Sequence, residues 1–262
     1  MKLLHPSLIE QYKQDIQSQA QKLYRNDFIS IDKEIYGKKS QKSLIFLIPY
    51  KNFTKLYFIS SDLNDLEKEL KNLDSNQLCL EIIQRGDLDL ELKDILKKHF
   101  TFHTRYEKLL INIKNLKSKI KRDFHTIQYA KNNDLDFIYT TLHTNFDERF
   151  DHLPSEQDLL NLIQNHQILI KKTGTEITAY CIYTLNGKTS HFNYLLNLKA
   201  EPFTLIALME EYYEQIKTKN IQYVYLWVDV LKNIRVKNMH LKYGYQSSNI
   251  FNHTFIKTNF KE

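Results

Sequence analysis

The feature that most constrains the fold is an order of elements that occurs twice along the chain. Each half carries strand-like apolar runs, then a helix, a strand, a second helix and a closing strand. In the first half these elements fall at residues 43–49, 55–60, 62–73, 77–83, 90–99 and 100–111. In the second half they fall at residues 167–172, 176–185, 190–198, 204–219, 222–230, 233–243 and 251–258. This repeat predicts two α/β units in tandem.

Other segments set the limits of the two units. A helical pattern at residues 7–24 opens the first half, while a strand at 123–130 and helices at 133–146 and 154–166 open the second. Between the halves lies the basic run "KNLKSKIKR", Lys114–Arg122, which we interpret as a solvated helix or linker, with a phosphate-binding patch as the alternative. The sequence therefore predicts domains at residues 1–117 and 118–262.

Composition excludes several classes of protein. With 262 residues, 42% hydrophobic and 26% charged, the chain reads as an ordinary globular protein. It has no apolar run of about 20 residues, so we expect no membrane association. Cys79 and Cys181 stand far apart, so neither a disulfide framework nor a metal site is indicated, and we expect a reduced, cytoplasmic protein. The formal charge of +6 is spread along the chain, and DNA is not an expected partner.

The segment "LWVDVLKNIRVKNMHLKYGY" carries the most specific pattern. Its Asn233 and Gly244 are eleven residues apart and enclose a short helix, and the glycine permits a left-handed helix end. Val236, Met239 and Tyr243 follow helical spacing and predict the buried face. Asn233 and His240 lie nearly two turns apart on one side, about 10 Å from each other, where they could follow an extended ligand.

This segment resembles the closing region of the GNAT superfamily of N-acetyltransferases, in which a strand, an asparagine, a short helix and a Gly-Phe or Gly-Tyr follow in order. Residues 124–258 fit the family's order of elements, and the first half resembles a degenerate copy. The resemblance implies an α/β (α+β) fold of two tandem GNAT-like units, each a mainly antiparallel mixed sheet flanked by helices. It also implies acetyl-CoA as cosubstrate.

The resemblance further implies where the coenzyme would lie. Strand amides near Leu196 and Leu198 would polarise the thioester carbonyl, and the helix that begins at Thr204, its expected N-cap, would face the pyrophosphate. The family usually has a glycine-rich loop there, whereas this chain has "LKAEPFTLIAL" with Glu201, whose charge would oppose phosphate binding. The expected coenzyme-binding residues are Leu196, Leu198, Lys199, Thr204, Leu205, Asn233 and Val236.

Three residues are candidate catalytic groups. His240 occupies a position that is often a tyrosine in the family, so it could protonate the leaving thiolate; the alternative is a histidine bonded to backbone at a helix end. His191 or Asp229 could accept a proton from the amine, the alternatives being an edge residue and a strand end. Strict alternation along residues 190–198 would put His191 and Asn193 on one face of the strand.

The acceptor side is predicted to include the loop "NFDERFDHLP". Its acidic residues could attract a cationic amine, although a plain solvated loop is the alternative. The expected substrate-binding residues are Phe146, Glu148, Asp151, His152 and Asn193.

The favoured function is that of an acyl-CoA-dependent N-acyltransferase, with an N-acetyltransferase first, acting on a primary amine of a small molecule such as an amino sugar. One alternative is a GNAT-like aminoacyltransferase that takes its acyl group from aminoacyl-tRNA, the only case in which tRNA is an expected partner. The other is a GNAT-derived binding protein without catalysis. The sequence does not indicate an oligomeric state.

Overall fold

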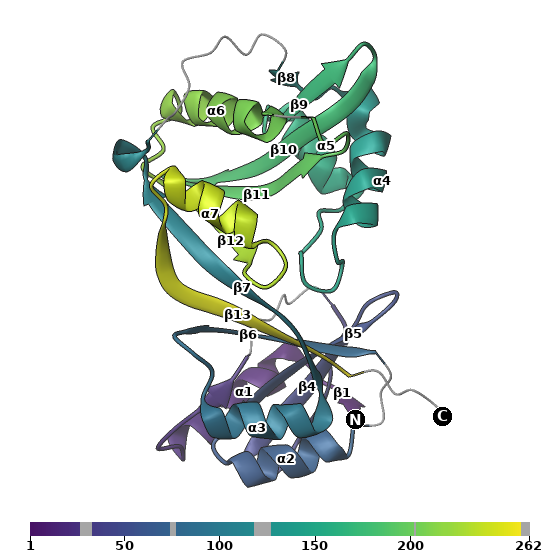
Figure 1. Cartoon of the computed structure of the whole chain (residues 1–262). Coiled ribbons are helices and arrows are strands. Elements are labelled where there is room, and N and C mark those ends of the chain that lie inside the picture. The colour runs from purple at the N-terminus through teal and green to yellow at the C-terminus, as the bar shows by residue number, and fades with distance from the viewer. Residues whose placement is uncertain (27–32, 74–76, 118–126, 202, 258–262) are drawn as a thin grey trace. The chain divides into compact units, whose positions relative to one another are not determined.

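The structure divides the chain into two compact units. A computed structural model describes residues 1–26, 33–73, 77–117, 127–201 and 203–257. Unit 1 consists of Met1–Tyr106 and Asn249–Glu262, and unit 2 consists of Glu107–Ser248 (Figure 1). The basic run predicted to link the halves lies in large part outside the described residues.

Unit 1 is a mixed sheet with three helices. In the described part of unit 1 the strands follow the order β1-β3-β4-β5-β6-β13-β7, and β2 pairs with β5. The elements are β1 (Lys2–Leu3), α1 (Pro6–Ser18), β2 (Tyr24–Arg25), β3 (Tyr36–Lys39), β4 (Ser43–Pro49), β5 (Thr54–Ser60), α2 (Leu63–Lys71), β6 (Leu78–Arg85), α3 (Leu90–His99) and parts of β7 (Thr101–Asn112) and β13 (Gln246–Lys257).

Unit 2 has the strand order β13-β7-β12-β11-β10-β9-β8. It contains η1 (Ile113–Asn115), β8 (Ile127–Tyr129), η2 (Asn132–Asp134), α4 (Leu135–Asn145), α5 (Glu156–Gln164), β9 (Ile168–Thr173), β10 (Glu176–Asn186), β11 (Thr189–Asn197), α6 (Thr204–Lys217), β12 (Tyr223–Asp229) and α7 (Ile234–Lys242). The series β3-β4-β5-α2-β6-α3-β7 thus recurs as β9-β10-β11-α6-β12-α7-β13. The predicted tandem α/β architecture is confirmed, whereas the short strands β1, β2 and β3 had no clear sequence signal.

Each sheet separates at its centre. In unit 2, β11 and β12 run parallel and pair only over residues 189–191 and 223–225, beyond which no pairing is recorded. In the described part of unit 1, the parallel strands β5 and β6 pair only at residues 54–55 and 78–79. Because the residues beyond these contacts lack a strand partner on one side, each unit has a place where backbone groups need another partner.

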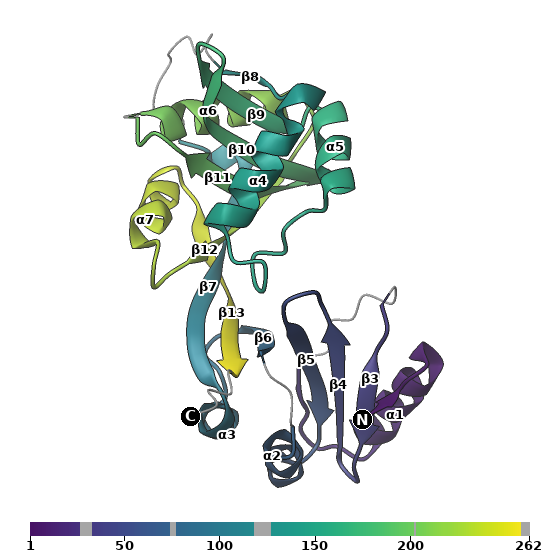
Figure 2. The ribbon, with the colours of Figure 1, turned by 90° about the vertical axis from the view of Figure 1, so that its right-hand side faces the viewer.

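Helices cover both faces of each sheet. In unit 2, α6 and α7 pack on one face through a core that includes Leu208, Tyr212 and Tyr243, while α4 and α5 pack on the opposite face through Ile138 and Leu159 (Figure 2). In unit 1, α2 and α3 cover one face of the sheet and α1 covers the other. Along α6, Leu208, Met209, Tyr212 and Ile216 are buried.

The division of the chain differs from two contiguous domains meeting at residues 117 and 118. Both β7 and β13 cross from one unit to the other, with the boundary after Tyr106 in β7 and after Ser248 in β13. In unit 1, residues 250–257 of β13 pair antiparallel with residues 85–78 of β6. The final strand of the second half therefore completes the sheet of unit 1.

Gly244 ends α7 because the chain turns there against a neighbouring backbone. Its φ is +101°, and a Cβ at this position would lie 2.8 Å from the backbone oxygen of Asn115. Just before it, the hydroxyl of Tyr243 donates a hydrogen bond to the buried carboxylate of Glu210 at 2.8 Å. A side chain larger than hydrogen at residue 244 would meet both a backbone contact and an unfavourable φ.

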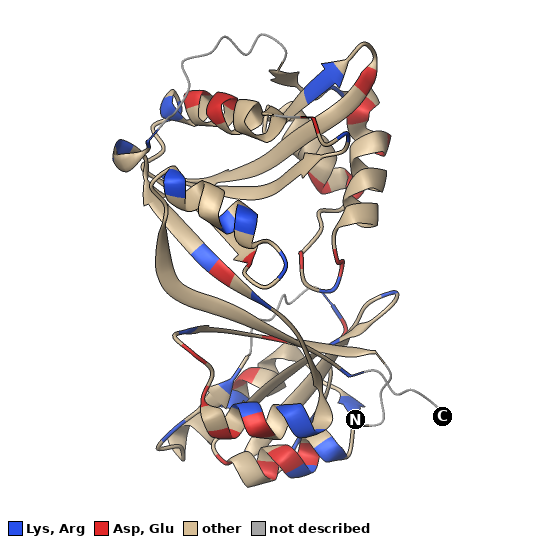
Figure 3. Ribbon diagram, in the orientation of Figure 1, with Lys and Arg blue, Asp and Glu red and all other residues tan. Residues whose placement is uncertain are grey.

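Charge is mixed rather than segregated along α2 and α3 of unit 1, where lysines are interspersed with Asp and Glu (Figure 3). Among the helices of the described residues, none combines the length and the apolar character that crossing a membrane requires.

Candidate functional site

The candidate site lies in unit 2, where β11 and β12 separate and where α6 and α7 begin. The register between β10 and β11 pairs Ile182 with Tyr194 and Tyr183 with Phe192, which leaves Asn193 without a partner. Asn193 is thus the extra residue of a β-bulge in β11. Such bulges re-aim the side chains of a strand and often occur next to functional sites.

The bulge overturns the strict alternation expected along β11. Phe192 packs with Tyr212 in the core beneath α6, whereas Tyr194 belongs to the core on the α4 and α5 side. Phe192 and Tyr194, which strict alternation would place on one face of β11, therefore lie on opposite faces. His191, the neighbour of Phe192, lies on the same face as Tyr194 because adjacent strand residues point in opposite directions.

The amides expected to polarise the thioester need correction. Leu198 donates its N–H to the carbonyl of Thr178 at 2.9 Å, so this amide points toward β10 and not toward the separation between the strands. By the period of two in an antiparallel ladder, the N–H of Leu196 points the same way, while those of Leu195 and Asn197 point away from β10. Leu195 and Asn197 supply the amides that face the separation, so the prediction was wrong by one residue.

The start of α6 has no side-chain cap. Phe203 precedes the helix with a left-handed backbone, φ 62°, and among the described residues no side chain caps the first-turn amides. Thr204 is not the N-cap expected from the sequence: it is the first helical residue, 1% exposed. Its hydroxyl instead takes part in a polar cluster beside the helix, which leaves the helix N-terminus available to an anion.

That polar cluster contains a lysine that the sequence did not indicate. Lys171, on β9, places its Nζ 2.6 Å from the carboxylate of Glu201 and 2.9 Å from Oγ1 of Thr204. The hydrogen bond from Lys171 is the main cause of a lowered pKa at Glu201. Lys199, one of the expected coenzyme-binding residues, forms an ion pair with Glu176 at 2.7 Å. The charge beside the helix start therefore comes from Lys171 and is already balanced by Glu201.

His240 does not fit the expected proton donor. It is 2% exposed, and its ring makes edge contacts with Phe192 and Tyr245, with centroids 6.0 and 5.2 Å away. Burial lowers the pKa of His240 to about 4, so the ring is neutral near pH 7. The interpretation of His240 as the general acid is wrong, and so is its placement on the ligand side of α7: the residue is part of the buried face.

Asn233 lies immediately before α7, and Val236 lies in the first turn of the helix. Asn233 is exposed at the N-cap position, and its side chain makes no cap hydrogen bond. Val236 is half-buried and packs against the core of α6 and the strands. Asn233 can therefore contact a ligand that lies at the start of the helix, whereas Val236 mainly fixes the helix.

Asp229 shapes the turn that leads into α7. Its carboxylate oxygen Oδ1 accepts hydrogen bonds from the backbone amides of Leu231 and Lys232, both at 2.9 Å, and its carbonyl accepts one from the amide of Asn233 at 2.9 Å. Asp229 is 6% exposed. These contacts assign it a structural role, which corrects its interpretation as a catalytic base.

His191 lies in an aromatic and cationic cluster. Its ring stacks on Tyr225 with centroids 4.3 Å apart, and Lys108 of β7 places its Nζ 4.2 Å from the same tyrosine ring. Burial, followed by the nearby charges of Lys108 and His152, lowers the pKa of His191 to about 4. A histidine with so low a pKa is a weak base, so the structure does not favour His191 as the group that deprotonates an amine.

The predicted acceptor loop is tied to β11. The hydroxyl of Tyr194 donates hydrogen bonds to the carbonyls of Asp151 and His152 at 2.8 and 2.9 Å, and the ring of Phe146 contacts the Tyr194 ring edge-on at 5.2 Å. Glu148 is exposed. The loop is therefore anchored at the bulged strand, which brings together most of the residues expected on the acceptor side.

Part of this loop is folded by its own charges. Arg149 forms two hydrogen bonds to the carboxylate of Asp147 at 2.8 and 2.7 Å, and the carboxylate of Asp151 accepts the amide of Asp147 at 2.7 Å. These contacts engage the carboxylates of Asp147 and Asp151 within the loop.

The equivalent separation in unit 1 is filled by the chain itself. The side-chain amide of Asn26 donates to the carbonyls of Leu56 on β5 and Glu81 on β6, both at 3.0 Å, and its Oδ1 accepts the amide of Phe58 at 2.7 Å. Residues 24–25 also add strand β2 to β5. Asn26, 2% exposed, thus satisfies the backbone groups that the separation would otherwise leave for a ligand.

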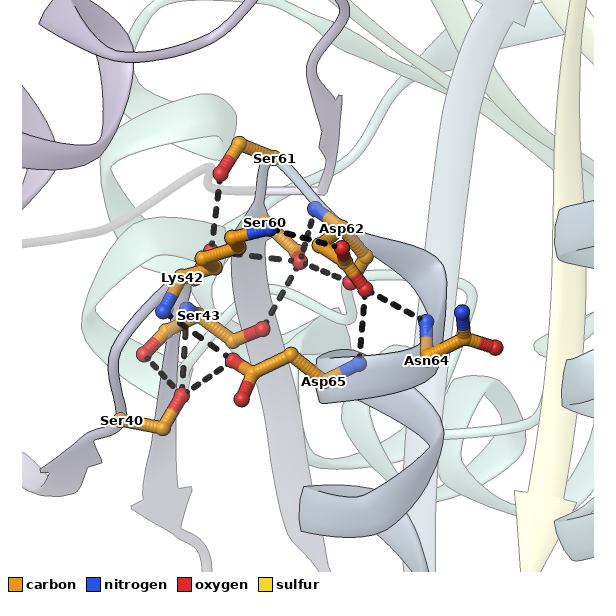
Figure 4. A network of polar contacts seen from close by, with 8 residues as sticks. All are labelled: Ser40, Lys42, Ser43, Ser60, Ser61, Asp62, Asn64 and Asp65. Atoms are coloured by element: carbon orange, nitrogen blue, oxygen red, sulfur yellow. Dashed lines mark hydrogen bonds and ion pairs between the residues drawn. The ribbon is translucent and has the colours of Figure 1, made fainter.

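The helix start in unit 1 that corresponds to α6 is also occupied. At α2, the carboxylate of Asp62 accepts the amides of Asn64 and Asp65 at 2.9 and 3.0 Å, and Asp65 accepts the hydroxyl of Ser40 (Figure 4). A carboxylate therefore already holds the first-turn donors. The two units differ at both positions, and unit 2 alone among the described residues has an uncapped helix start beside an unfilled strand separation.

Several residues of the site gave no usable signal in the sequence. Lys108, Lys171 and Asn26 occur in ordinary strand or loop contexts, and only the register of the sheets brings them to their positions. The sequence predicts that Tyr225 and Trp227 lie in a strand, but it does not indicate which face of the sheet their side chains occupy.

Comparison with known proteins supports the fold. No protein-family model matches the sequence, and no curated protein is similar to it in sequence. A solved structure of a conserved protein of unknown function from Staphylococcus epidermidis matches with a TM-score of 0.53 and 20% identity, covering 88% of this chain and 96% of that one. A GNAT-family acetyltransferase from Colwellia psychrerythraea matches with a TM-score of 0.55 and 14% identity, covering 98% and 99%.

A tandem GNAT protein from the clavulanic acid biosynthesis pathway matches with a TM-score of 0.51 and 6% identity, covering 90% of this chain and 83% of that one. Identities this low establish the fold and not the activity. Together with the repeated element order and the separated central strands, these similarities show that the chain has the tandem fold of the GNAT acetyltransferases.

Proposed function

We propose that this protein is an acyl-CoA-dependent N-acyltransferase with a single coenzyme site, in unit 2, and a small-molecule primary amine as acceptor. The observation that carries the proposal is the difference between the units. Asn26 and Asp62 fill the strand separation and cap the helix start in unit 1, whereas α6 has no side-chain cap and β11 and β12 separate after three paired residues.

Three parts of an acyl-CoA would have a matching group in unit 2: the thioester, the pyrophosphate and the pantetheine arm. The amides of Leu195 and Asn197 point into the strand separation, where they would donate to the thioester oxygen and stabilise the negative charge that forms on it. The uncapped start of α6 would face the pyrophosphate. Asn233, exposed at the start of α7, would contact the pantetheine arm.

The reaction would proceed by direct attack within a ternary complex. The neutral amine nitrogen forms a bond to the acyl carbon, the carbon–sulfur bond breaks, and the proton lost by the amine balances the one taken up by the thiolate. The contribution of the protein is to hold the two reactants together and to stabilise the oxyanion. His240 has no proton-transfer role because it is buried and neutral near pH 7. Asp229 has none because its carboxylate accepts two backbone amides.

Calorimetry with acetyl-CoA tests the coenzyme site directly. We expect binding of one acetyl-CoA per chain, and we expect Asn233→Ala to raise the Kd about 3- to 10-fold because one hydrogen bond is lost. The matched control is Asn238→Ala, another exposed asparagine on the same helix, which should leave the Kd unchanged. Two molecules bound per chain would contradict the interpretation of unit 1.

A thiol-release assay with acetyl-CoA and a panel of primary amines then tests catalysis. Failure to bind any acyl-CoA would overturn the proposed function. Binding of tRNA in its place would favour an aminoacyl-tRNA donor, and binding of neither would favour a protein that has the fold without the reaction.

A further inference from the structure

The acceptor face of unit 2 carries an ammonium group that has no acidic partner within the part of the chain that the structure describes. Lys108 lies half-buried on β7, with its Nζ 4.2 Å from the centroid of Tyr225 and 6.0 Å from that of Trp227. Among the described residues no Asp or Glu forms an ion pair with it. A cation over aromatic rings keeps its full charge, which remains available to an anion.

His191, which stacks on the same Tyr225 ring, adds a neutral hydrogen-bond donor near this charge. The hydroxyl of Thr184 donates to Oδ1 of Asn193 at 3.2 Å, which leaves Nδ2 of that side chain facing Nδ1 of His191 at 2.9 Å. Nδ1 then accepts, and the proton of the neutral ring lies on Nε2. Nε2 has no hydrogen-bond partner among the described residues, and it is not one of the buried unpartnered atoms.

The carboxylates in this region are held by other groups. Asp229 accepts two backbone amides, and Arg149 forms a bidentate pair with Asp147. Glu107, the neighbour of Lys108, points to the opposite face and pairs with Lys237 of α7 at 2.6 Å. The positive charge of Lys108 is therefore not neutralised by any of these carboxylates.

We propose that the acceptor carries a carboxylate as well as its amine, and that Lys108 and the Nε2–H of His191 bind this carboxylate. The inference rests on the proposed acyl transfer and names its substrate class, amino acids and related amino carboxylates. One ammonium and one neutral donor match the single charge and two oxygens of a carboxylate better than a doubly charged phosphate, for which arginine forks or several cations are the usual partners.

The test compares acceptors that differ only in the carboxylate. The twenty common amino acids and their carboxamides are assayed with acetyl-CoA by thiol release, and the same compounds are screened by thermal shift without acyl donor. We expect at least one amino acid to be acylated and to stabilise the protein, while its carboxamide has a KM about 10- to 100-fold higher, since a hydrogen bond between charged groups is lost.

Three variants locate the effect. Lys108→Met should raise the KM of the amino acid about 10- to 100-fold, leave that of the carboxamide unchanged and leave the Kd of acetyl-CoA unchanged, whereas Lys108→Arg should retain the preference. The matched control Lys188→Met removes an exposed lysine from the β10–β11 turn and should change none of these values.

The outcomes separate this inference from the proposed function. Acylation of amines with equal KM for acids and amides, or with preference for 2-aminoethyl phosphate, overturns the carboxylate site and leaves the acyltransferase intact. Absence of turnover together with carboxylate-dependent stabilisation, lost in Lys108→Met, overturns the acyltransferase and retains the carboxylate site. If no amino acid is bound or acylated, the carboxylate site is wrong.

Discussion

The ammonium of Lys171 lies 2.6 Å from the carboxylate of Glu201, directly beside the first residue of α6. Glu201 is the residue whose charge the sequence placed in conflict with a coenzyme pyrophosphate. The ion pair removes most of that conflict, because the added negative charge is matched at contact distance. It also restrains the side chain of Lys171, because the ammonium donates hydrogen bonds to Glu201 and to Thr204.

Glu201→Gln should therefore strengthen acetyl-CoA binding. The change leaves the positive charge of Lys171 uncompensated near the expected phosphates, and a partly exposed pair of this kind supports an effect of about 2- to 5-fold in Kd. Calorimetry at low and high salt measures it, and the gain should shrink as salt is added. Glu214→Gln, which breaks the Glu214–Lys217 pair near the far end of α6, is the control and should have no effect. Weaker binding in Glu201→Gln would show that the pair organises the site.

Tyr194→Phe should impair acceptor use and spare the coenzyme. The hydroxyl of Tyr194 supplies both hydrogen bonds to the carbonyls of Asp151 and His152, so its removal weakens the attachment of the acceptor loop to β11. We expect the KM of the acceptor to rise about 3- to 10-fold while the Kd of acetyl-CoA stays the same. Tyr183→Phe removes a comparable hydroxyl, bonded to the carbonyl of His166, and should change neither value. Equal effects of the two variants on acceptor KM would argue against a role for the loop.

His240 should make the protein less stable in acid. Because burial lowers the pKa of His240 from 6.5 to about 4, the unfolded chain binds a proton between these pH values and the folded chain does not. Stability is then greatest above pH 6.5 and falls as the pH drops toward 4, by up to about 3 kcal/mol for this residue. Urea unfolding from pH 7.5 to 4.5 should show a shallower loss in His240→Phe. Parallel curves for the two proteins would mean that the ring can take up a proton in the folded state.

Asn26→Ala should destabilise unit 1. The substitution leaves two carbonyls and one amide of β5 and β6 without partners in a buried place, and we expect a loss of about 2–4 kcal/mol in the free energy of unfolding. Urea denaturation measures it, with the exposed Asn64→Ala on α2 as control. Acetyl-CoA binding should stay at one per chain, because Asp62 still occupies the start of α2. A change within experimental error of the control would show that water replaces the amide without cost.

Most helices and strands could be predicted from the sequence because periodicity and turn residues are local properties. Helix α3 falls at residues 90–99 and β4 at 43–49, the ranges expected from the pattern. Asn233 and the helix that ends at Gly244 also lie where the motif indicated. These features depend on neighbours within a few residues, which a single sequence displays directly.

The site was less accessible because it depends on register and on contacts between distant segments. One unpaired residue, Asn193, reverses the faces assigned along β11, and no composition signal marks a bulge of this kind. His240 fits the spacing of an exposed polar stripe equally well as that of the buried face. Lys171 reaches Thr204 across two elements 33 residues apart in the chain, a contact that no local pattern encodes.

Because β7 and β13 cross from one unit to the other, unit 1 cannot be completed before unit 2 has been synthesised. Residues 250–257, which pair with β6 in unit 1, are synthesised after all of unit 2. The edge of β6 therefore stays without β13 until unit 2 has been translated. A nascent chain stalled before residue 249 would expose that edge to other nascent chains, so the sheet of unit 1 is completed only when β13 has been synthesised.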